Sequence, residues 1–143
     1  MNEDAQIEYI LNTKKVIAVV GCSKNAGKPA HDVPAVMQSK GYKIIPINPT
    51  ADEILGEKCY PSLLDLPFEL KKEIGIIDIF RPPEEVGQIV AQVIKLKHET
   101  GQNYVIWAQL GIRDDVAAGV AKAEGLEMVQ DKCIKIEYNR LSL

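Results

Sequence analysis

The sequence has little of what several classes of protein require. Only three residues are cysteine and two are histidine, and Cys22, Cys59 and Cys133 lie far apart with no C-x-x-C motif. This sparse, odd set predicts reduced thiols in a cytoplasmic protein and excludes a disulfide framework. Neither histidine has another potential ligand at zinc spacing, so we expect no metal site.

Charge and hydropathy exclude two further classes. The net charge is −3 and is spread along the chain, whereas a nucleic-acid-binding domain carries a basic patch or tail. No apolar run approaches the roughly 20 residues of a membrane-spanning helix. The acidic start, MNEDAQIEYI, does not have the form of a secretory signal. We therefore expect a cytoplasmic protein that binds neither nucleic acid nor membrane, folded as a single domain over residues 1–143.

Strand-like and helix-like segments alternate along the chain. The predicted strands are Val16–Val20, Lys43–Ile47 and residues 74–80, 104–107 and 126–129. The predicted helices cover residues 4–12, 32–40, 82–97, 113–124 and 132–140, and residues 48–65 are expected to be irregular apart from a turn near 62–64. Pro34 suits the first turn of its helix, where a missing N–H costs nothing. This alternation predicts an α/β fold, a five-stranded parallel sheet with helices on both faces.

The most informative stretch is KVIAVVGCSKNAGKPAH, in which a buried strand ends at a glycine and a loop leads into a helix. The loop carries the small, amide and basic residues typical of an anion site: Gly21, Ser23, Lys24, Asn25, Gly27 and Lys28. Backbone N–H groups and the positive end of the helix dipole meet at such a point, and phosphate is the expected occupant. The alternative is that the two glycines only shape a tight turn.

The glycine spacing matches neither common nucleotide loop. The dinucleotide motif G-x-G-x-x-G is broken by Ser23, and a Walker A loop is excluded because five residues separate Gly21 from Gly27. Pro29 also stands where a Walker A loop has Ser or Thr. After the second strand, Asn48 replaces the acidic residue usual in NAD sites. A phosphate-bearing nucleotide is predicted, with ordinary NAD and ATP disfavoured and NADP left open.

Ligands of parallel sheets bind outside the carboxyl ends of the strands, which directs attention to the other strand ends. Arg81 follows the third strand, where its guanidinium can hold a phosphate through two hydrogen bonds. The alternative is an ion pair with Glu84 or Glu85. The neighbouring Phe80 is suited to pack on a base or to belong to the core.

Two more strand ends carry candidate residues. Asn48 and Pro49 form a rigid turn that can border an adenine or be a plain turn. After the fourth strand, Gln109 offers a donor and an acceptor to an amide-containing ligand, and Gly111 allows close backbone approach. Trp107, within that strand, is expected in the core. No Ser or Cys has a base and an orienting acid in its sequence context, so no catalytic residue is predicted.

Five stretches, in order, carry a resemblance to a known family: IAVVGCSKNAGKPAHDV, GYKIIPINPTADEILGEKCYPSLLDLP, IIDIFRPPEEV, VIWAQLGI and DKCIKIEYNRL. The chain resembles the small stand-alone CoA-binding proteins, which look like the CoA-binding domain of the succinyl-CoA synthetase α subunit. The resemblance covers about the whole chain and implies a five-stranded Rossmann-like domain that binds coenzyme A. It implies diphosphate contacts from Gly21, Ser23, Lys24 and Asn25, adenosine contacts from Asn48 and Pro49, nucleotide contacts from Phe80 and Arg81, and pantetheine contacts from Gln109, Leu110 and Gly111.

The chain departs from that family at two positions. Many relatives have Ser where Ala30 stands, and Asp32 is a candidate replacement for the missing helix cap, although its charge would oppose a phosphate. The synthetases have an acidic residue where Leu110 stands. The chain also ends before a domain that would supply the synthetase's phosphorylated histidine, so we expect that ligase activity is absent.

Cys22 joins the predicted ligand-binding residues as a hypothesis about redox chemistry. It lies near a helix N-terminus and lysines, a setting that lowers a thiol pKa. A low-pKa thiol would form a mixed disulfide with CoA under oxidation. The alternative is a small residue packed beneath the helix.

These observations predict a protein that binds CoA or an acyl-CoA without catalysis of its own. A role as a CoA sensor or redox-linked regulator, working through a protein partner, is one form of this hypothesis. The alternatives are a nucleotide-dependent enzyme, either an NADP oxidoreductase or a subunit of an acyl-CoA ligase.

Overall fold

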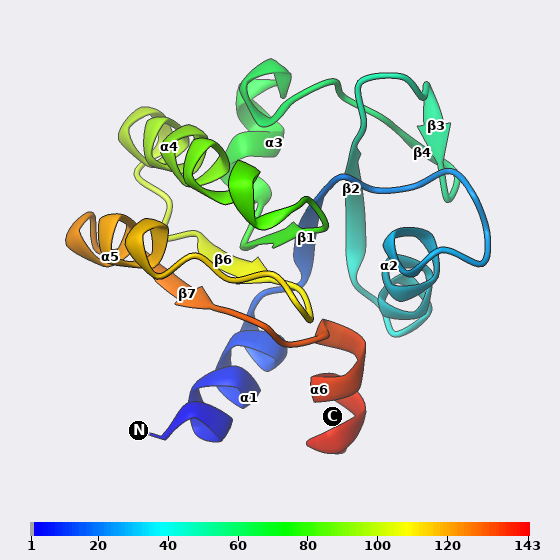
Figure 1. The fold of residues 1–143 in the computed structure, drawn as a ribbon. Helices are drawn as coiled ribbons and strands as arrows, with labels where there is room; N and C mark the ends of the chain where they lie inside the picture. The colour runs from blue at the N-terminus through cyan, green and yellow to red at the C-terminus, as the bar shows by residue number, and fades with distance from the viewer. Residues whose placement is uncertain (1) are drawn as a thin grey trace.

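A five-stranded parallel sheet lies at the centre of the molecule, in the order β2-β1-β5-β6-β7 (Figure 1). The computed structural model describes residues 2–143. The strands of this sheet are β1 (Val16–Val20), β2 (Lys43–Ile47), β5 (Ile76–Ile79), β6 (Val105–Ala108) and β7 (Glu127–Val129). The strands in the middle of the sheet are apolar at almost every position because both of their faces are covered.

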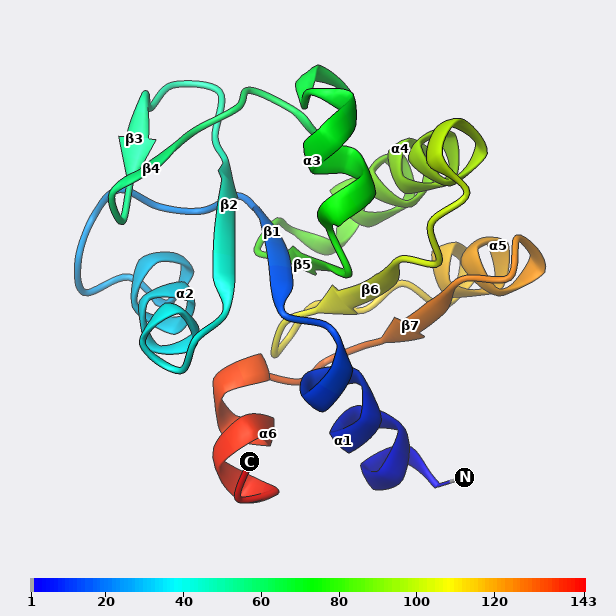
Figure 2. The same cartoon turned by 180° about the vertical axis from the view of Figure 1, so that it is seen from behind.

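Helices cover both faces of the sheet (Figures 1 and 2). One face packs against α1 (Glu3–Thr13), α2 (Pro29–Ser39) and α6 (Ile134–Arg140). The other packs against the 3₁₀ turn η1 (Leu63–Asp65), α3 (Phe68–Glu73), α4 (Pro83–Thr100) and α5 (Asp115–Ala123). The predicted α/β class, with a parallel sheet between two helical layers, is therefore confirmed. Within residues 2–143, no helix has the length and apolar character needed to span a bilayer.

The prediction for Trp107 is also confirmed. This side chain is fully buried in the cluster beneath α1, α2 and α6. Its indole Nε1 donates a hydrogen bond to the carbonyl oxygen of Lys132 at 2.7 Å. A buried indole N–H needs such a partner, and this one holds the segment before α6 against the sheet.

Helix α2 begins at Pro29, three residues before the predicted start at residue 32. Pro29 takes the first helical position, so the prediction that Pro34 lies in the first turn is wrong. Pro34 lies further inside the helix, where its missing N–H leaves the carbonyl oxygen of Ala30 without the usual donor. The backbone N–H of Ser23 donates to that oxygen at 3.0 Å. Because Pro34 leaves this carbonyl oxygen free, the hydrogen bond from Ser23 can attach the preceding loop to the helix.

Three small elements were not expected from the sequence. A two-stranded hairpin, β3 (Glu53–Ile54) and β4 (Glu57–Lys58), interrupts the segment predicted to be irregular. Helix α3 is only six residues long and has no side-chain cap, so neither a periodic pattern nor a start signal revealed it. Strand β5 is shorter than the predicted residues 74–80, because Ile74 ends α3 and the strand itself ends at Ile79.

Candidate functional site

The sheet grows in opposite directions from β1, since β2 lies on one side of it and β5 on the other. The loops that follow β1 and β5 diverge to opposite layers, which opens a crevice at the carboxyl ends of these strands. Two cavities lie along this crevice, a first of about 590 Å³ and a second of about 740 Å³. Both have the size of small-molecule sites. They share four lining residues, Lys28, Ala30, Phe80 and Arg81.

Gly21 allows the two loops to meet in this crevice. Its φ is +88°, and a Cβ atom there would lie 2.7 Å from both the Phe80 carbonyl oxygen and Arg81 Cδ. Its backbone N–H donates to the carbonyl oxygen of Ile47 at 3.1 Å. Any side chain would be strained by the φ angle and would push Arg81 away. The glycine therefore brings the β1 loop into direct contact with the end of β5.

The loop after Gly21 is held by its own polar groups. Ser23 Oγ accepts a hydrogen bond from the backbone N–H of Asn25 at 3.1 Å. The Asp32 carboxylate accepts from the N–H of Gly27 at 3.1 and 3.2 Å, and the His31 ring lies beside it. The hydrogen bond from Gly27 and the neighbouring His31 lower the Asp32 pKa, with the larger effect from His31.

Asp32 does not replace the missing cap of α2. The N-cap residue is Lys28, and no side chain caps this end of the helix. Asp32 is bonded to the loop instead, and Ala30, in the first turn, lines both cavities. An uncapped helix N-terminus with a lysine beside it favours an anion.

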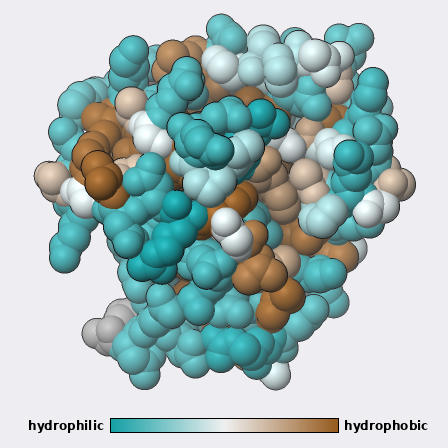
Figure 3. Space-filling view, viewed as in Figure 1, coloured by the Kyte–Doolittle hydropathy of each residue, from teal (hydrophilic) through white to brown (hydrophobic). Residues whose placement is uncertain are grey.

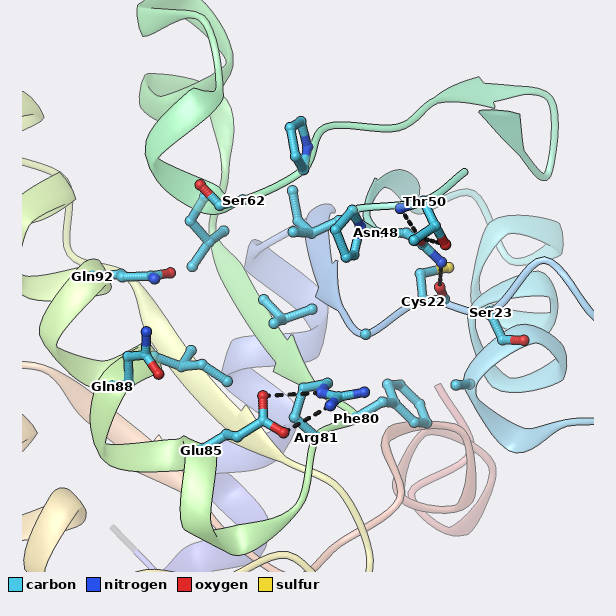
Figure 4. Close-up of a pocket in the computed structure, with 18 of the residues that line it drawn as sticks. Cys22, Ser23, Asn48, Thr50, Ser62, Phe80, Arg81, Glu85, Gln88 and Gln92 are labelled. Carbon is cyan, nitrogen blue, oxygen red and sulfur yellow. Dashed lines mark hydrogen bonds and ion pairs between the residues drawn. The ribbon is translucent and has the colours of Figure 1, made fainter. Parts of the chain in front are cut away.

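Asn48 fastens the loop after β2 to the loop after β1 (Figure 4). Its Nδ2 donates to the carbonyl oxygen of Cys22 at 2.9 Å, and its Oδ1 accepts from the N–H groups of Thr50 and Ala51 at 2.7 and 3.0 Å. The residue lines the first cavity with Pro49. Because these contacts engage both ends of its amide, Asn48 shapes the cavity wall.

Arg81 pairs with Glu85 at the junction of the two cavities (Figure 4). Its Nη2 and Nε donate to the Glu85 carboxylate at 2.7 and 3.2 Å. The guanidinium lowers the Glu85 pKa, and both side chains are partly open to solvent. The ion pair that the sequence suggested as an alternative role for Arg81 therefore forms, with Glu85 as its partner. The exposed guanidinium still borders both cavities.

The prediction of a low-pKa thiol at Cys22 is wrong. The side chain is buried, and burial raises its pKa to about 12, with further contributions from Cys59 and Asp78. A thiolate loses its hydration in such a site, which outweighs the nearby helix end. Cys22 lines the first cavity as a small apolar residue, so the basis for a ready disulfide exchange is removed.

The second cavity contains one buried amide side chain. Gln109 is 4% exposed, and its Oε1 accepts from the backbone N–H of Ile134 at 3.2 Å. The N–H group is only a donor, so the amide oxygen must face it. This is the only side-chain hydrogen bond of Gln109 among residues 2–143. Its Nε2 group is then the donor available to a ligand carbonyl.

Most predicted binding residues border one of the two cavities. The first is lined by Gly21, Cys22, Ser23, Lys28, Asn48, Pro49, Phe80 and Arg81, and the second by Lys28, Phe80, Arg81, Gln109 and Leu110. Lys24, Asn25 and Gly111 are exposed and lie outside both linings. The N–H of Gly111 donates to the Asp131 carboxylate at 2.6 Å.

Sequence reasoning missed the contribution of α4 to the first cavity. Gln88 and Gln92 line the end of this cavity that lies away from Asn48, where Ser62 also lies (Figure 4). The spacing from Glu85 to Gln88 and Gln92 places all three on one side of a helix, beside the apolar stripe. That spacing was the available signal. Within the described chain, no group of three His, Cys, Asp or Glu side chains could hold a metal ion.

Together, the sheet order and the crevice between β1 and β5 define a Rossmann-like ligand-binding domain. The family model of the CoA binding domain matches residues 15–139. The chain belongs to this family.

Some similar proteins have about the same length as this chain, and others are much longer. The uncharacterised Bacillus subtilis protein YneT is 36% identical over 134 residues, which cover 94% of this chain and 93% of that protein. A hypothetical protein from Pyrococcus horikoshii has a solved structure with a TM-score of 0.87 and 34% identity, covering 99% of this chain and 94% of the other. The ADP-forming acetate–CoA ligase II of Archaeoglobus fulgidus is 39% identical over 83 residues, 57% of this chain but only 12% of the ligase.

Proposed function

We propose that this protein binds CoA across the two cavities. The observation that carries the proposal is their junction, where Lys28, Arg81 and the uncapped start of α2 lie between a cavity of mixed polar and apolar lining and a mostly apolar one. Two cations beside a helix N-terminus suit a diphosphate. The nucleotide then occupies the first cavity, and the pantetheine arm enters the second.

The contents of each cavity favour CoA over NAD. CoA continues beyond its diphosphate as a flexible chain with two amide groups, whereas NAD continues as a second ribose. The second cavity offers apolar walls and the Nε2 donor of Gln109, which suit an amide carbonyl on a hydrocarbon arm. After β2, Asn48 is engaged with neighbouring backbone and presents no carboxylate to a ribose.

We further propose a binding role without catalysis, in which the protein carries or senses CoA. Two observations support this role: the Cys22 thiol has a raised pKa, and the Glu85 carboxylate is paired with Arg81. The similarity to ADP-forming ligases supports a second candidate, a CoA-binding part of an acyl-CoA ligase assembly. Formation of acyl-CoA from CoA, ATP and a carboxylic acid, with copurified partners added, would favour that candidate.

Calorimetric titration with CoA, NAD and NADP tests the binding proposal. We expect CoA to bind most tightly. Lys28→Ala should weaken CoA binding by about ten- to a hundredfold, the value of one charge-assisted hydrogen bond. Lys24→Ala is the matched control, since this lysine lies in the same loop but outside both cavities, and it should bind like the parent. Tighter binding of NAD or NADP, or an equal effect of both variants, would contradict the proposed site.

A further inference from the structure

We infer that the second cavity accepts an apolar acyl group, so that the protein binds an aliphatic acyl-CoA thioester more tightly than free CoA. The inference rests on the proposed function, because it assigns the far end of a ligand whose nucleotide lies in the first cavity. It concerns the chemical class of the group attached to the ligand's sulfur.

The walls of the second cavity are mostly hydrocarbon. Apart from Lys28, Arg81, Gln109 and Lys135, its lining consists of Pro29, Ala30, Val33, Phe80, Pro82, Leu110, Ile112, Cys133 and Ile136. These residues come from the start of α2, the end of β5, the loop after β6 and the start of α6. The amide arm of CoA needs polar partners, but this cavity offers only one amide side chain among mostly apolar walls. The apolar walls therefore suit a hydrocarbon group attached to the arm.

Two large apolar side chains stand open to water at this cavity. Leu110 is 65% exposed and Ile136 is 49% exposed. Apolar side chains gather on this face of the molecule beside the start of α6 (Figure 3). Each would lose its contact with water if a hydrocarbon chain lay between them, and that burial favours binding.

The two cavities adjoin at four shared lining residues, which places both within reach of one extended ligand. Phe80 and Arg81 border each of them, and so do Lys28 and Ala30 from the other side of the crevice. Beyond this junction, the second cavity offers a ligand held by its phosphates both the buried amide of Gln109 and the exposed side chain of Leu110. The cavity therefore holds both an amide donor for the arm of an acyl-CoA and an apolar surface for its acyl chain.

An uncharged acyl chain fits this lining better than a dicarboxylic one. Lys135 is a possible partner for a terminal carboxylate. Its charge also acts weakly on the Asp32 carboxylate, whose pKa it helps to lower. Leu110, Ile112 and Ile136 offer no polar group to a carboxylate.

Competition against a fluorescent CoA analogue tests the inference with acetyl-, butyryl-, hexanoyl- and succinyl-CoA beside free CoA. Each buried methylene adds about two- to fourfold in affinity, so hexanoyl-CoA should bind at least about tenfold more tightly than acetyl-CoA. Leu110→Ser and Ile136→Ser should each reduce this ratio severalfold, because each should weaken hexanoyl-CoA binding more than it weakens the binding of free CoA or acetyl-CoA. Val116→Ser is the control, because Val116 is 80% exposed on α5, away from both cavities.

The outcomes separate the two proposals. If no CoA species binds, the proposed function fails. If CoA binds but all acyl forms bind equally, or if succinyl-CoA binds best, the apolar acyl site is refuted while CoA binding stands. A chain-length preference that survives in both serine variants would also overturn the assignment to this cavity.

Discussion

Asp78 should make the protein less stable as the pH rises toward neutrality. This residue lies in the middle of the sheet, on β5 between Val19 and Trp107. It is 1% exposed, and its Oδ1 atom has no hydrogen-bond partner in the described chain. Burial raises the pKa of this carboxyl well above its usual range, because an unpaired carboxylate is poorly solvated there.

The sign of the effect follows from which state holds the proton. The folded-state pKa exceeds the unfolded value, so the unfolded chain releases this proton first as the pH rises. The stabilisation is fully present below the unfolded pKa of about 3.9 and is lost between that value and the folded-state pKa. Within this window the loss is about 1.4 kcal/mol per pH unit. Each pH unit of this window therefore removes a substantial part of a typical unfolding free energy of about 5–15 kcal/mol.

Asp78→Asn isolates this contribution, since asparagine has the shape of the neutral acid and does not ionise. In urea unfolding at pH 5, 6 and 7, the unfolding free energy of the variant should rise relative to that of the parent protein as the pH increases. Asp52→Asn removes an exposed carboxylate and serves as the control, with stability following that of the parent. Parallel stability curves for the parent and Asp78→Asn across this range would refute the reasoning.

Three further predictions concern the two cavities. Arg81→Ala should weaken CoA binding by about ten- to a hundredfold, the value of a charged hydrogen bond to phosphate, while its melting temperature changes little because the ion pair with Glu85 is exposed. Equal binding by parent and variant would remove Arg81 from the site. Cys22 should react with iodoacetamide only after unfolding, given its burial and a pKa of about 12; rapid labelling of the native protein would contradict this. Gln109→Glu keeps an acceptor for the Ile134 N–H but loses the Nε2 donor, so it should weaken CoA binding and spare adenosine 3′,5′-bisphosphate, which lacks the amide arm. Equal losses for both ligands would indicate a purely structural role.

Local patterns in the sequence were sufficient for the architecture. Val16–Val20 and Lys43–Ile47 were predicted as strands at the bounds that the structure shows, because a strand covered on both faces must be apolar at nearly every position. The predicted start of α2 at residue 32 was wrong, because Pro29 and Pro34 both have the fixed φ of a first helical turn and the helix begins at Pro29. The contact between Ser23 and Ala30, which accommodates Pro34 inside the helix, depends on how the loop packs.

The order of strands and helices along the chain, and the strand ends that carry the candidate binding residues, were predictable because they follow from hydrophobic periodicity and turn residues. The protonation behaviour of Cys22, in contrast, depends on tertiary packing. The sequence neighbours of Cys22 suggest a low thiol pKa. The packed fold excludes water from the thiol, and this burial raises its pKa. The second cavity was decided in the same way, because its walls come from four segments distant in sequence. Burial and cavity shape depend on which segments the sheet brings together, and no local pattern records that.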